Sequence, residues 1–245
     1  MLVALLAIVA AVPSAAASTW GTTRRTAGVV VSEEVQQIGT TVQGRPILAV
    51  HRWTDAAAKP LLFLGSMHGE EQAGMRVVRR LRRVDLPAGV NLWLVPTMNP
   101  DGTAVDLRDN AHGVDLNRNF PTYFRRSDRG TTLWSGPSPA SEPEVRATMR
   151  LLRTVSPFTV LSLHQPLHAV DTYRMKSPAL VRQLHRLTGL PYAPLSCHDG
   201  CHGTMTDWFN THFPGRAVTM EFAHRASVAE INRMADAAIA VAGSS

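Results

Sequence analysis

Short, continuously apolar segments alternate with longer segments of helical periodicity along most of the chain. LLFLGS at 61–66 and Val90–Val95 are apolar throughout, whereas residues 72–84 place apolar side chains on one helical face. The order strand, helix, strand, with uninterrupted apolar strands, is typical of a parallel or mixed sheet that is covered on both faces.

The same alternation continues to the end of the sequence. Helices are predicted over Glu142–Thr154, with Ser141 as the cap, over Pro178–Thr188 and over Ser227–Val241, and strands over Thr159–Leu163 and Arg216–Phe222. Upstream, Val35–Ile38 and Pro46–Val50 flank Gln43-Gly44 and predict a hairpin. The pattern predicts one α/β domain with a mixed, mostly parallel central sheet and helices on both faces.

Residues 102–140 interrupt this rhythm. They are rich in Gly, Asp, Asn, Arg, Ser and Pro and predict long irregular connections. Connections of that length within a compact domain usually serve function.

Composition supports a globular protein. The chain has 245 residues, of which 44% are hydrophobic and 18% charged. These values exclude a disordered chain, a collagen and a polytopic membrane protein, and the length suits a single domain.

The formal net charge of +6 comes from 25 basic and 19 acidic residues. The densest basic cluster, Arg76 to Arg83, carries five arginines and invites a nucleic-acid interpretation. Val77, Val78 and Leu81 form an apolar stripe within the same segment, so the arginines are better explained as the solvated face of a helix. We therefore expect no nucleic-acid partner.

The amino terminus has the pattern of an export signal. Residues 2–12 are apolar, Pro13 ends the run, and Ala15-Ala16-Ala17 provides the small residues of a signal-peptidase site. We predict a signal peptide over 1–17, a single folded domain over 18–245, and a secreted or cell-envelope location. Because no Lys or Arg precedes the apolar run, an uncleaved membrane anchor stays an alternative. No other segment is long and apolar enough to span a bilayer.

The two cysteines, Cys197 and Cys201, suit a small disulfide loop in an oxidising compartment. Two alternatives remain at this point. The neighbouring His198 and His202 give the segment the residue types of a metal site, and the thiols could also both be free.

Groups that can bind metal or move protons follow three separate predicted strands: His68 with Glu71, then His164, then Glu221. The carboxyl ends of parallel strands converge on one crevice. Each group alone would more often be structural, and Glu221 could pair with an arginine, but all three together favour a site. Two imidazoles and a carboxylate suit a catalytic zinc, and the separate Glu221 could accept a proton from water.

Five motifs extend this pattern. MHGEE at 67–71, NPDG at 99–102, GVDLNRNF at 113–120, SLHQP at 162–166 and TMEF at 219–222 occur in this order, after an opening IGTTVQGRPI at 38–47. Over about residues 35–240 the chain resembles the M14 zinc carboxypeptidases, and most of all their short bacterial branch of the murein peptide amidase type.

The resemblance implies a role for each matching residue. It implies that His68, Glu71 and His164 bind one zinc ion, with Glu70 as second choice for the carboxylate ligand. It also implies that Glu221 is general base and then acid. Asn117 and Arg118 would hold the terminal carboxylate of the substrate, and Arg108 would polarise the scissile carbonyl. Guanidinium groups suit both tasks.

The chain departs from the digestive members of that family. No tyrosine lies between Cys197 and Glu221, where they carry a loop tyrosine, and Gln165-Pro166 replaces their Ser-Tyr after the third ligand. His198 and His202 are candidates for the tyrosine's place. The expected activity is hydrolysis of a terminal amide bond in short peptides, with the γ-D-glutamyl-diaminopimelate bond of murein stem peptides as the leading substrate. A general carboxypeptidase, an N-acyl amino acid deacylase and a non-catalytic wall-binding module are the alternatives.

Overall fold

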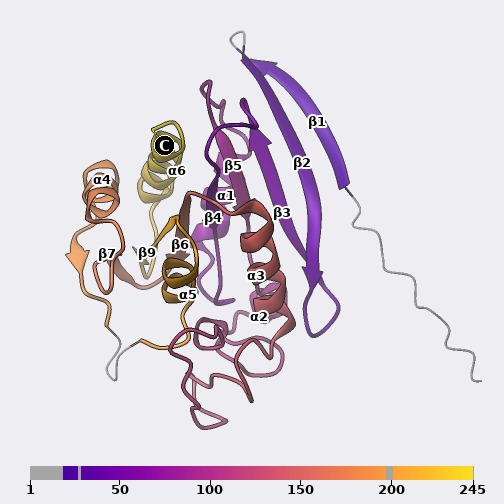
Figure 1. Cartoon of the computed structure of the whole chain (residues 1–245), viewed down its shortest axis with the longest axis vertical. Helices are drawn as coiled ribbons and strands as arrows, with labels where there is room; N and C mark the ends of the chain where they lie inside the picture. The colour runs from indigo at the N-terminus through magenta and orange to yellow at the C-terminus, as the bar shows by residue number, and fades with distance from the viewer. Residues whose placement is uncertain (1–18, 27–28, 197–200, 245) are drawn as a thin grey trace, which may run out of the picture.

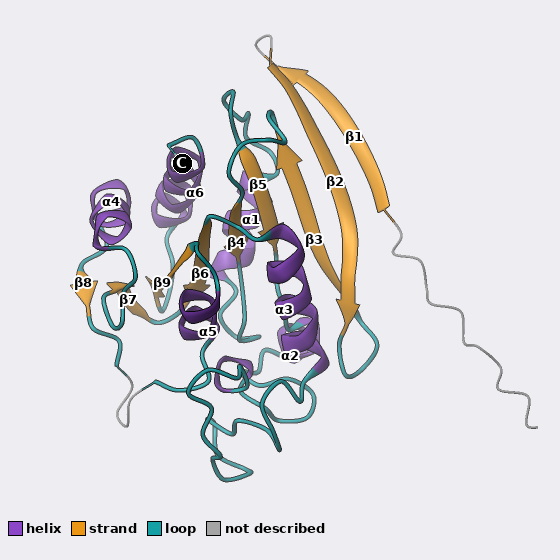
Figure 2. Cartoon of the chain, viewed as in Figure 1, coloured by secondary structure: helices purple, strands orange, loops and turns teal. Residues whose placement is uncertain are grey.

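One mixed sheet runs through the part of the protein that the computed structural model describes, residues 19–26, 29–196 and 201–244 (Figures 1 and 2). Within these residues its strand order is β1-β2-β3-β5-β4-β6-β9-β7-β8. The strands are β1 (Thr19–Thr26), β2 (Val29–Thr40), β3 (Pro46–Trp53), β4 (Leu61–Leu64), β5 (Asn91–Val95), β6 (Thr159–His164), β7 (Leu167–Asp171), β8 (Tyr192–Ala193) and β9 (Arg216–Ala223).

The central strands β5, β4, β6 and β9 are parallel. Strands β1, β2 and β3 continue the sheet antiparallel on one side, and β7 is antiparallel to β9 on the other. The predicted mixed sheet is confirmed. Among the described residues four of its eight strand pairings are parallel, three at the centre and one between β7 and β8, so the sheet is less parallel than the expected mostly parallel one.

Helices cover both faces of the sheet (Figure 1). Helices α1, α4 and α6 belong to one core and α3 and α5 to the other. Their bounds are α1 (Ala73–Leu81), α2 (Pro100–Val105), α3 (Pro143–Val155), α4 (Pro178–Thr188), α5 (Met205–His212) and α6 (Val228–Ala242). The predicted single α/β domain with helices on both faces is confirmed.

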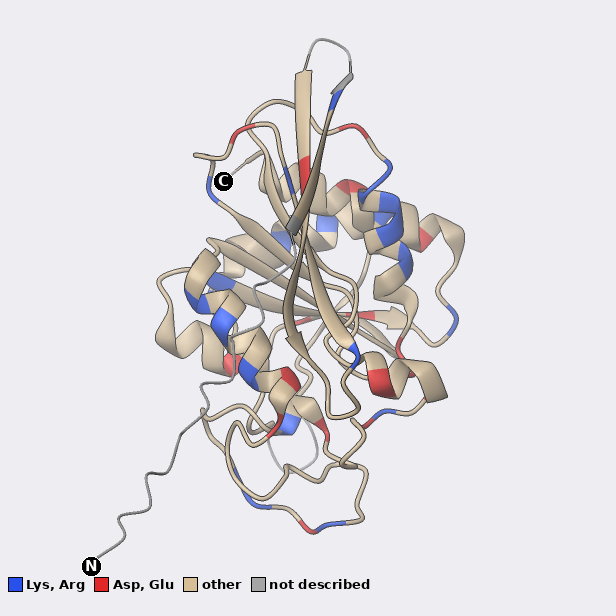
Figure 3. Ribbon diagram, turned by 90° about the vertical axis from the view of Figure 1, so that its right-hand side faces the viewer, with Lys and Arg blue, Asp and Glu red and all other residues tan. Residues whose placement is uncertain are grey.

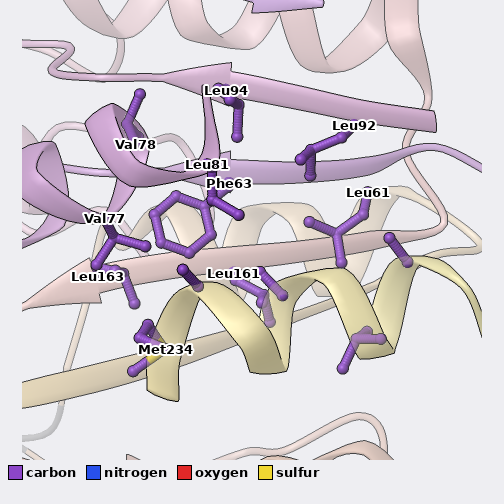
Figure 4. Close-up of a cluster of buried hydrophobic side chains, with 14 of the residues drawn as sticks. Leu61, Phe63, Val77, Val78, Leu81, Leu92, Leu94, Leu161, Leu163 and Met234 are labelled. Carbon is purple, nitrogen blue, oxygen red and sulfur yellow. The ribbon is translucent and has the colours of Figure 1, made fainter. Parts of the chain in front are cut away.

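The two cores explain why the central strands are apolar at every position. In β4, Leu61 and Phe63 face the core under α1 and α6, while Leu62 and Leu64 face the core under α3 and α5. Figure 4 shows the first of these cores, in which Phe63 lies among side chains of α1 and β6 and near Met234 of α6. A strand buried on both faces needs no polar alternation.

The predicted elements match closely where periodicity is strong. The helix expected over Pro178–Thr188 is α4, and the hairpin around Gln43-Gly44 is formed by longer strands, β2 and β3. Gly44 has a φ of +79°, a conformation that favours glycine. The predicted Ser141 cap is wrong. Pro143 occupies the first turn of α3, so the capping position falls on Glu142, to whose side chain Ser141 donates a 2.6 Å hydrogen bond.

Several elements were not predicted from the sequence: β1, β7, β8, α2 and α5. The first is a polar edge strand, and the others are short. Residues 102–140 are otherwise mostly irregular, with a single 3-10 turn over Leu116–Arg118 within the described chain.

Most of the arginines in and directly after α1 are exposed, as the helical pattern predicts. Arg76, Arg79, Arg82 and Arg83 are exposed, whereas the apolar stripe of the same helix is buried. Figure 3 shows basic residues spread over several helices and loops and interspersed with acidic ones. No helix among the described residues is long and apolar enough to cross a membrane. The predicted signal peptide over 1–17 lies outside the described residues.

Candidate active site

The predicted chemical residues meet at the carboxyl ends of three central strands. His164 is the last residue of β6 and pairs in register with Glu221 of β9. His68 and Glu71 lie in the segment between β4 and α1. That segment folds tightly against the start of α1, because a Cβ on Gly74 would fall 1.5 Å from the carbonyl oxygen of Gly65. Glycine at this position brings the segment and helix α1 into direct backbone contact.

Two imidazoles and one carboxylate converge on a single point. The Nδ1 atoms of His68 and His164 lie 3.4 Å apart. Glu71 reaches both, with Oε1 at 2.8 Å from His68 Nδ1 and Oε2 at 3.0 Å from His164 Nδ1. All three side chains are buried. Glu70, the second choice for the carboxylate, is exposed and lines a different hollow.

This spacing fits zinc. Nitrogen ligands about 2.0–2.1 Å from a tetrahedral ion lie about 3.3–3.4 Å from each other, which matches the separation of the two Nδ1 atoms. Among the described residues these three form the one group of histidine, cysteine and acidic side chains close enough to hold a metal ion. Three protein ligands leave a coordination position for water, as in catalytic sites.

Each imidazole ring is held by a polar partner at Nε2, the nitrogen that does not face the cluster. Nε2 of His68 donates to Oδ1 of Asp115 at 3.1 Å, and Nε2 of His164 lies 3.2 Å from Oγ of Ser162. Such contacts set the tautomer and leave Nδ1 free to bind a metal. The sequence analysis did not single out Asp115. Its place inside GVDLNRNF was the available signal, but a local role also accounts for an aspartate there. Its Oδ1 accepts from the backbone N–H of Asn117 at 2.8 Å and so caps the turn.

Asp115 also holds Arg108. Oδ2 of Asp115 accepts from Nε and Nη2 of Arg108 at 3.1 and 2.9 Å. Burial opposes ionisation of Asp115, but the positive charges of His68 and Arg108 outweigh it and keep the pKa of Asp115 well below its usual range. One buried carboxylate therefore orients both an imidazole and a guanidinium of the site.

The pKa values of the ligand set show strong mutual attraction. Burial lowers the pKa of His68, but Asp115 and Glu71 outweigh it and raise that pKa to about 9. Burial raises the pKa of Glu71, while His68 and His164 lower it more. The acidic surroundings that raise the pKa of His68 also favour a bound metal cation, which would displace a proton from its Nδ1.

Glu221 differs from these carboxylates. Burial raises its pKa, and its Oε2 accepts a hydrogen bond from the backbone N–H of Leu167 at 3.2 Å. No arginine of the described chain pairs with it, so the structural alternative of an ion pair finds no support. A carboxyl with a raised pKa beside a metal cluster suits proton transfer.

A cleft of about 630 Å³ connects these groups. It is lined by every predicted site residue, His68, Glu71, Arg108, Asn117, Arg118, His164 and Glu221. Burial lowers the pKa of Arg118, whose Nη1 donates to the carbonyl of Asn117 at 2.8 Å. Asn117 Oδ1 in turn accepts from the backbone of Met205 at 3.0 Å. This wall of the cleft is thus held by the start of α5.

The cysteine segment borders the same cleft. Cys201 lines it and is disulfide-bonded, whereas Cys197 and His198 lie outside the described residues. His202 is half-buried and does not line the cleft. Tyr173, which the sequence analysis did not single out, does.

Asp109, next to Arg108, makes a separate prediction about stability. Its Oδ1 is buried with no hydrogen-bond partner in the described structure, and burial together with Asp115 raises its pKa to about 6. The unfolded pKa is about 4, so ionisation of Asp109 costs stability as the pH rises through 6. Asp109→Asn should stabilise the protein at pH 7.5 by about 1 kcal/mol, allowing for solvent screening, and by less at pH 5.

Urea unfolding at both pH values measures this difference. Asp128→Asn, at an exposed position, is the control and should change stability little at either pH. A loss of stability in Asp109→Asn at pH 7.5 would show that the ionised carboxylate is stabilised in the fold.

Sequence comparisons extend the picture. A family model described as zinc carboxypeptidase matches residues 32–179. Murein peptide amidase A of Escherichia coli K12 is 32% identical over 154 residues, which cover 57% of this chain and 62% of that protein. The human carboxypeptidase N catalytic chain is 30% identical over 169 residues, which cover 53% of this chain and 37% of that one. The chain therefore spans less than two thirds of the curated relatives that it matches.

Solved structures show the same fold. The murein-tripeptide amidase of Escherichia coli O157 superposes with a TM-score of 0.68 at 25% identity, over 85% of this chain and 91% of that one. Carboxypeptidase A of Helicoverpa armigera superposes with a TM-score of 0.66 at 19% identity, over 85% and 69%. The second likeness is one of fold alone.

Proposed function

Because the chain belongs to the zinc carboxypeptidase family, we propose that it hydrolyses the amide bond before a terminal residue of short peptides. The observation that carries this proposal is the cleft itself. It is lined by the cluster of His68, Glu71 and His164, by a separate carboxylate with a raised pKa, Glu221, and by Asn117 and the cationic Arg118. A hydrolase of this family needs all three parts.

In this proposal His68, Glu71 and His164 hold the zinc ion. When bound, zinc lowers the pKa of a coordinated water to about 7 and polarises the substrate carbonyl. Asp115 and Ser162 keep the two imidazole rings oriented for it.

The other residues act on the substrate and the protons. Asn117 and Arg118 bind the terminal carboxylate, because a guanidinium offers a planar pair of donors that matches a carboxylate. Arg108, held in place by Asp115, stabilises negative charge on the carbonyl oxygen. Glu221 accepts the proton of the attacking water and passes it to the leaving amine.

For the substrate we propose murein stem peptides, cut at the γ-D-glutamyl-diaminopimelate bond. Support comes from the similarity to the murein peptide amidases, one of which has the same fold at 25% identity. We also propose that the protein is exported to the cell envelope or secreted, on the basis of the apolar run and small residues within 1–17. Export would bring the enzyme to the wall where such peptides arise.

The test is incubation of the protein from Ser18 onward with L-Ala-γ-D-Glu-meso-diaminopimelate and a panel of ordinary and N-acylated peptides, followed by mass spectrometry. We expect release of free diaminopimelate that stops on chelation and resumes with zinc. Release from ordinary peptides alone would indicate a general carboxypeptidase, and release from N-acyl amino acids a deacylase. Binding without hydrolysis of any substrate, with zinc present, would favour the wall-binding module.

A further inference from the structure

Gln165 joins the two chain segments that carry Glu71 and Glu221. It directly follows His164, at the carboxyl end of β6, and lines the cleft. Its side-chain amide makes three hydrogen bonds, to backbone groups that lie 58, 59 and 92 positions away in sequence. These contacts therefore hold together segments that are far apart along the chain.

The amide oxygen holds the segment of the metal ligands. Oε1 of Gln165 accepts from the backbone N–H of Ala73 at 2.9 Å, two residues after Glu71. Ala73 is the first residue of α1, so its N–H has no acceptor within the helix. Gln72, at the capping position of α1, makes no capping hydrogen bond with its side chain. The Gln165 amide thus caps α1 from another part of the chain.

The amide nitrogen holds the end of the strand that bears Glu221. Nε2 of Gln165 donates to the backbone carbonyls of Ala223 at 3.2 Å and His224 at 3.0 Å. Ala223 is the last residue of β9 and lies two residues after Glu221. The chain just after Gln165 also contacts Glu221 itself, because Leu167 N–H donates to its Oε2 at 3.2 Å. This short segment is thus attached to β9 twice, once at the carboxylate.

A single planar amide makes all these bonds, so it fixes the spacing between the two segments. All three of its partners lie within three residues of Glu71 or Glu221. A displacement of about 1 Å in an active site can cost about 10²-fold in rate. The position of the amide therefore bears on the relative placement of the two carboxylates.

We propose that Gln165 is a positioning residue, which keeps Glu71 and Glu221 in their relative places by linking the start of α1 to the end of β9. This inference rests on the proposed function, since it assumes that Glu71 binds zinc and that Glu221 transfers the proton. Loss of the amide should then affect both zinc binding and proton transfer.

Gln165→Met keeps the approximate length of the side chain and removes its three hydrogen bonds. We expect it to weaken zinc binding by about 10–100-fold and to lower kcat at saturating zinc by about tenfold or more, with KM nearly unchanged. Competition with a chromophoric chelator gives the zinc affinity, and assays with L-Ala-γ-D-Glu-meso-diaminopimelate give kcat and KM. A side chain that only stabilised the fold would change the urea midpoint and neither of these quantities.

Gln165→Glu separates the two halves of the amide. An ionised carboxylate can still accept from Ala73 N–H, but it cannot donate to the carbonyls of Ala223 and His224. Zinc affinity should stay at or above that of the parent protein, because the added negative charge also attracts a cation. The kcat value should fall as in Gln165→Met, and a full kcat in Gln165→Glu would overturn the inference.

Asn91→Leu is the matched control. Asn91 is buried, and its Nδ2 likewise donates to two backbone carbonyls, those of Ala56 at 3.1 Å and Ala58 at 3.0 Å. It is the first residue of β5, which runs parallel to β4, so it lies at the end of the sheet opposite to the site. Asn91→Leu should lower the urea midpoint and leave kcat and zinc affinity unchanged.

The outcomes separate this inference from the proposed function. If the parent protein hydrolyses the peptide and Gln165→Met keeps either its kcat or its zinc affinity, the hydrolase is supported and the positioning role is overturned. An equal loss of kcat in Asn91→Leu would also overturn it, because the loss would then follow stability. If the parent protein hydrolyses no substrate, the proposed function fails and the zinc titration still decides. Weaker zinc binding in Gln165→Met then supports the link to the ligand segment, and equal affinity overturns it.

Discussion

Replacing Glu221 by glutamine is expected to lower kcat by about 10³–10⁴-fold while the bound zinc stays stoichiometric. Glutamine preserves the size of the side chain and its carbonyl can still accept from Leu167 N–H, as the carboxylate does at 3.2 Å. What it removes is the site that takes and returns a proton. Stopped-time product assays at saturating substrate, with zinc measured by atomic absorption on the same samples, check both parts.

The matched control is Glu144→Gln. Glu144 is also a buried carboxylate whose pKa is raised by burial, but it lies in α3 and accepts from Val42 and Asn110 away from the cleft. Its loss should leave kcat close to that of the parent enzyme. Should Glu221→Gln instead lose zinc in proportion to activity, Glu221 would be a ligand and the proton carrier would have to be sought elsewhere.

The position of this site could be predicted because it depends on short-range rules. His164 ends a buried strand, and His68 and Glu71 follow another. Once both strands are recognised as parallel neighbours, their carboxyl ends must share one edge of the sheet. Tight sequence spacing and strand order therefore carry much of the information about this cluster.

Two acidic residues of the cleft lining, Asp171 and Asp207, could not be predicted in this way. Asp171 belongs to β7, a five-residue strand with two exposed positions at its start, and Asp207 to α5, a helix of eight residues. Neither segment has a strong periodicity, and their approach is set by tertiary packing of β7 and α5 around β9. A lone aspartate in a weak element gives no sign of which cleft it will face.

Asp115 was missed for a different reason. Its capping contact with Asn117 N–H is a local role that explains the residue adequately from sequence. Its contact with His68 joins it to the segment between β4 and α1, 47 positions earlier in the sequence. Its contact with Arg108 joins it to the irregular segment that precedes Asp115. Because the local contact already explains the aspartate, the sequence gives no separate sign of its long-range contacts.

Those contacts predict the second large effect. Asp115→Asn should weaken zinc binding by about 10–100-fold and reduce kcat/KM at saturating zinc by about 10²-fold or more. An asparagine has one acceptor oxygen. If that oxygen stays on His68 Nε2, the amide N–H₂ faces the donors of Arg108, and the guanidinium loses its anchor. If the amide is turned the other way, His68 Nε2 and the backbone N–H of Asn117 lose the oxygen that accepts their hydrogen bonds.

Asp101→Asn is the control that separates this effect from general destabilisation. Asp101 is as deeply buried, and it also accepts from an arginine, Arg45 Nη1 at 2.7 Å, as well as from Thr41 Oγ1 at 2.8 Å. These partners hold the β2–β3 turn and not the cleft. Both variants should unfold at lower urea concentration, because each removes a buried carboxylate that pairs with a buried or half-buried cation. Only Asp115→Asn should change zinc affinity, measured by competition with a chromophoric chelator. Equal zinc affinity in the two variants would mean that His68 is held in place without Asp115, so that the orientation of the metal cluster comes from the packing of the β4–α1 segment.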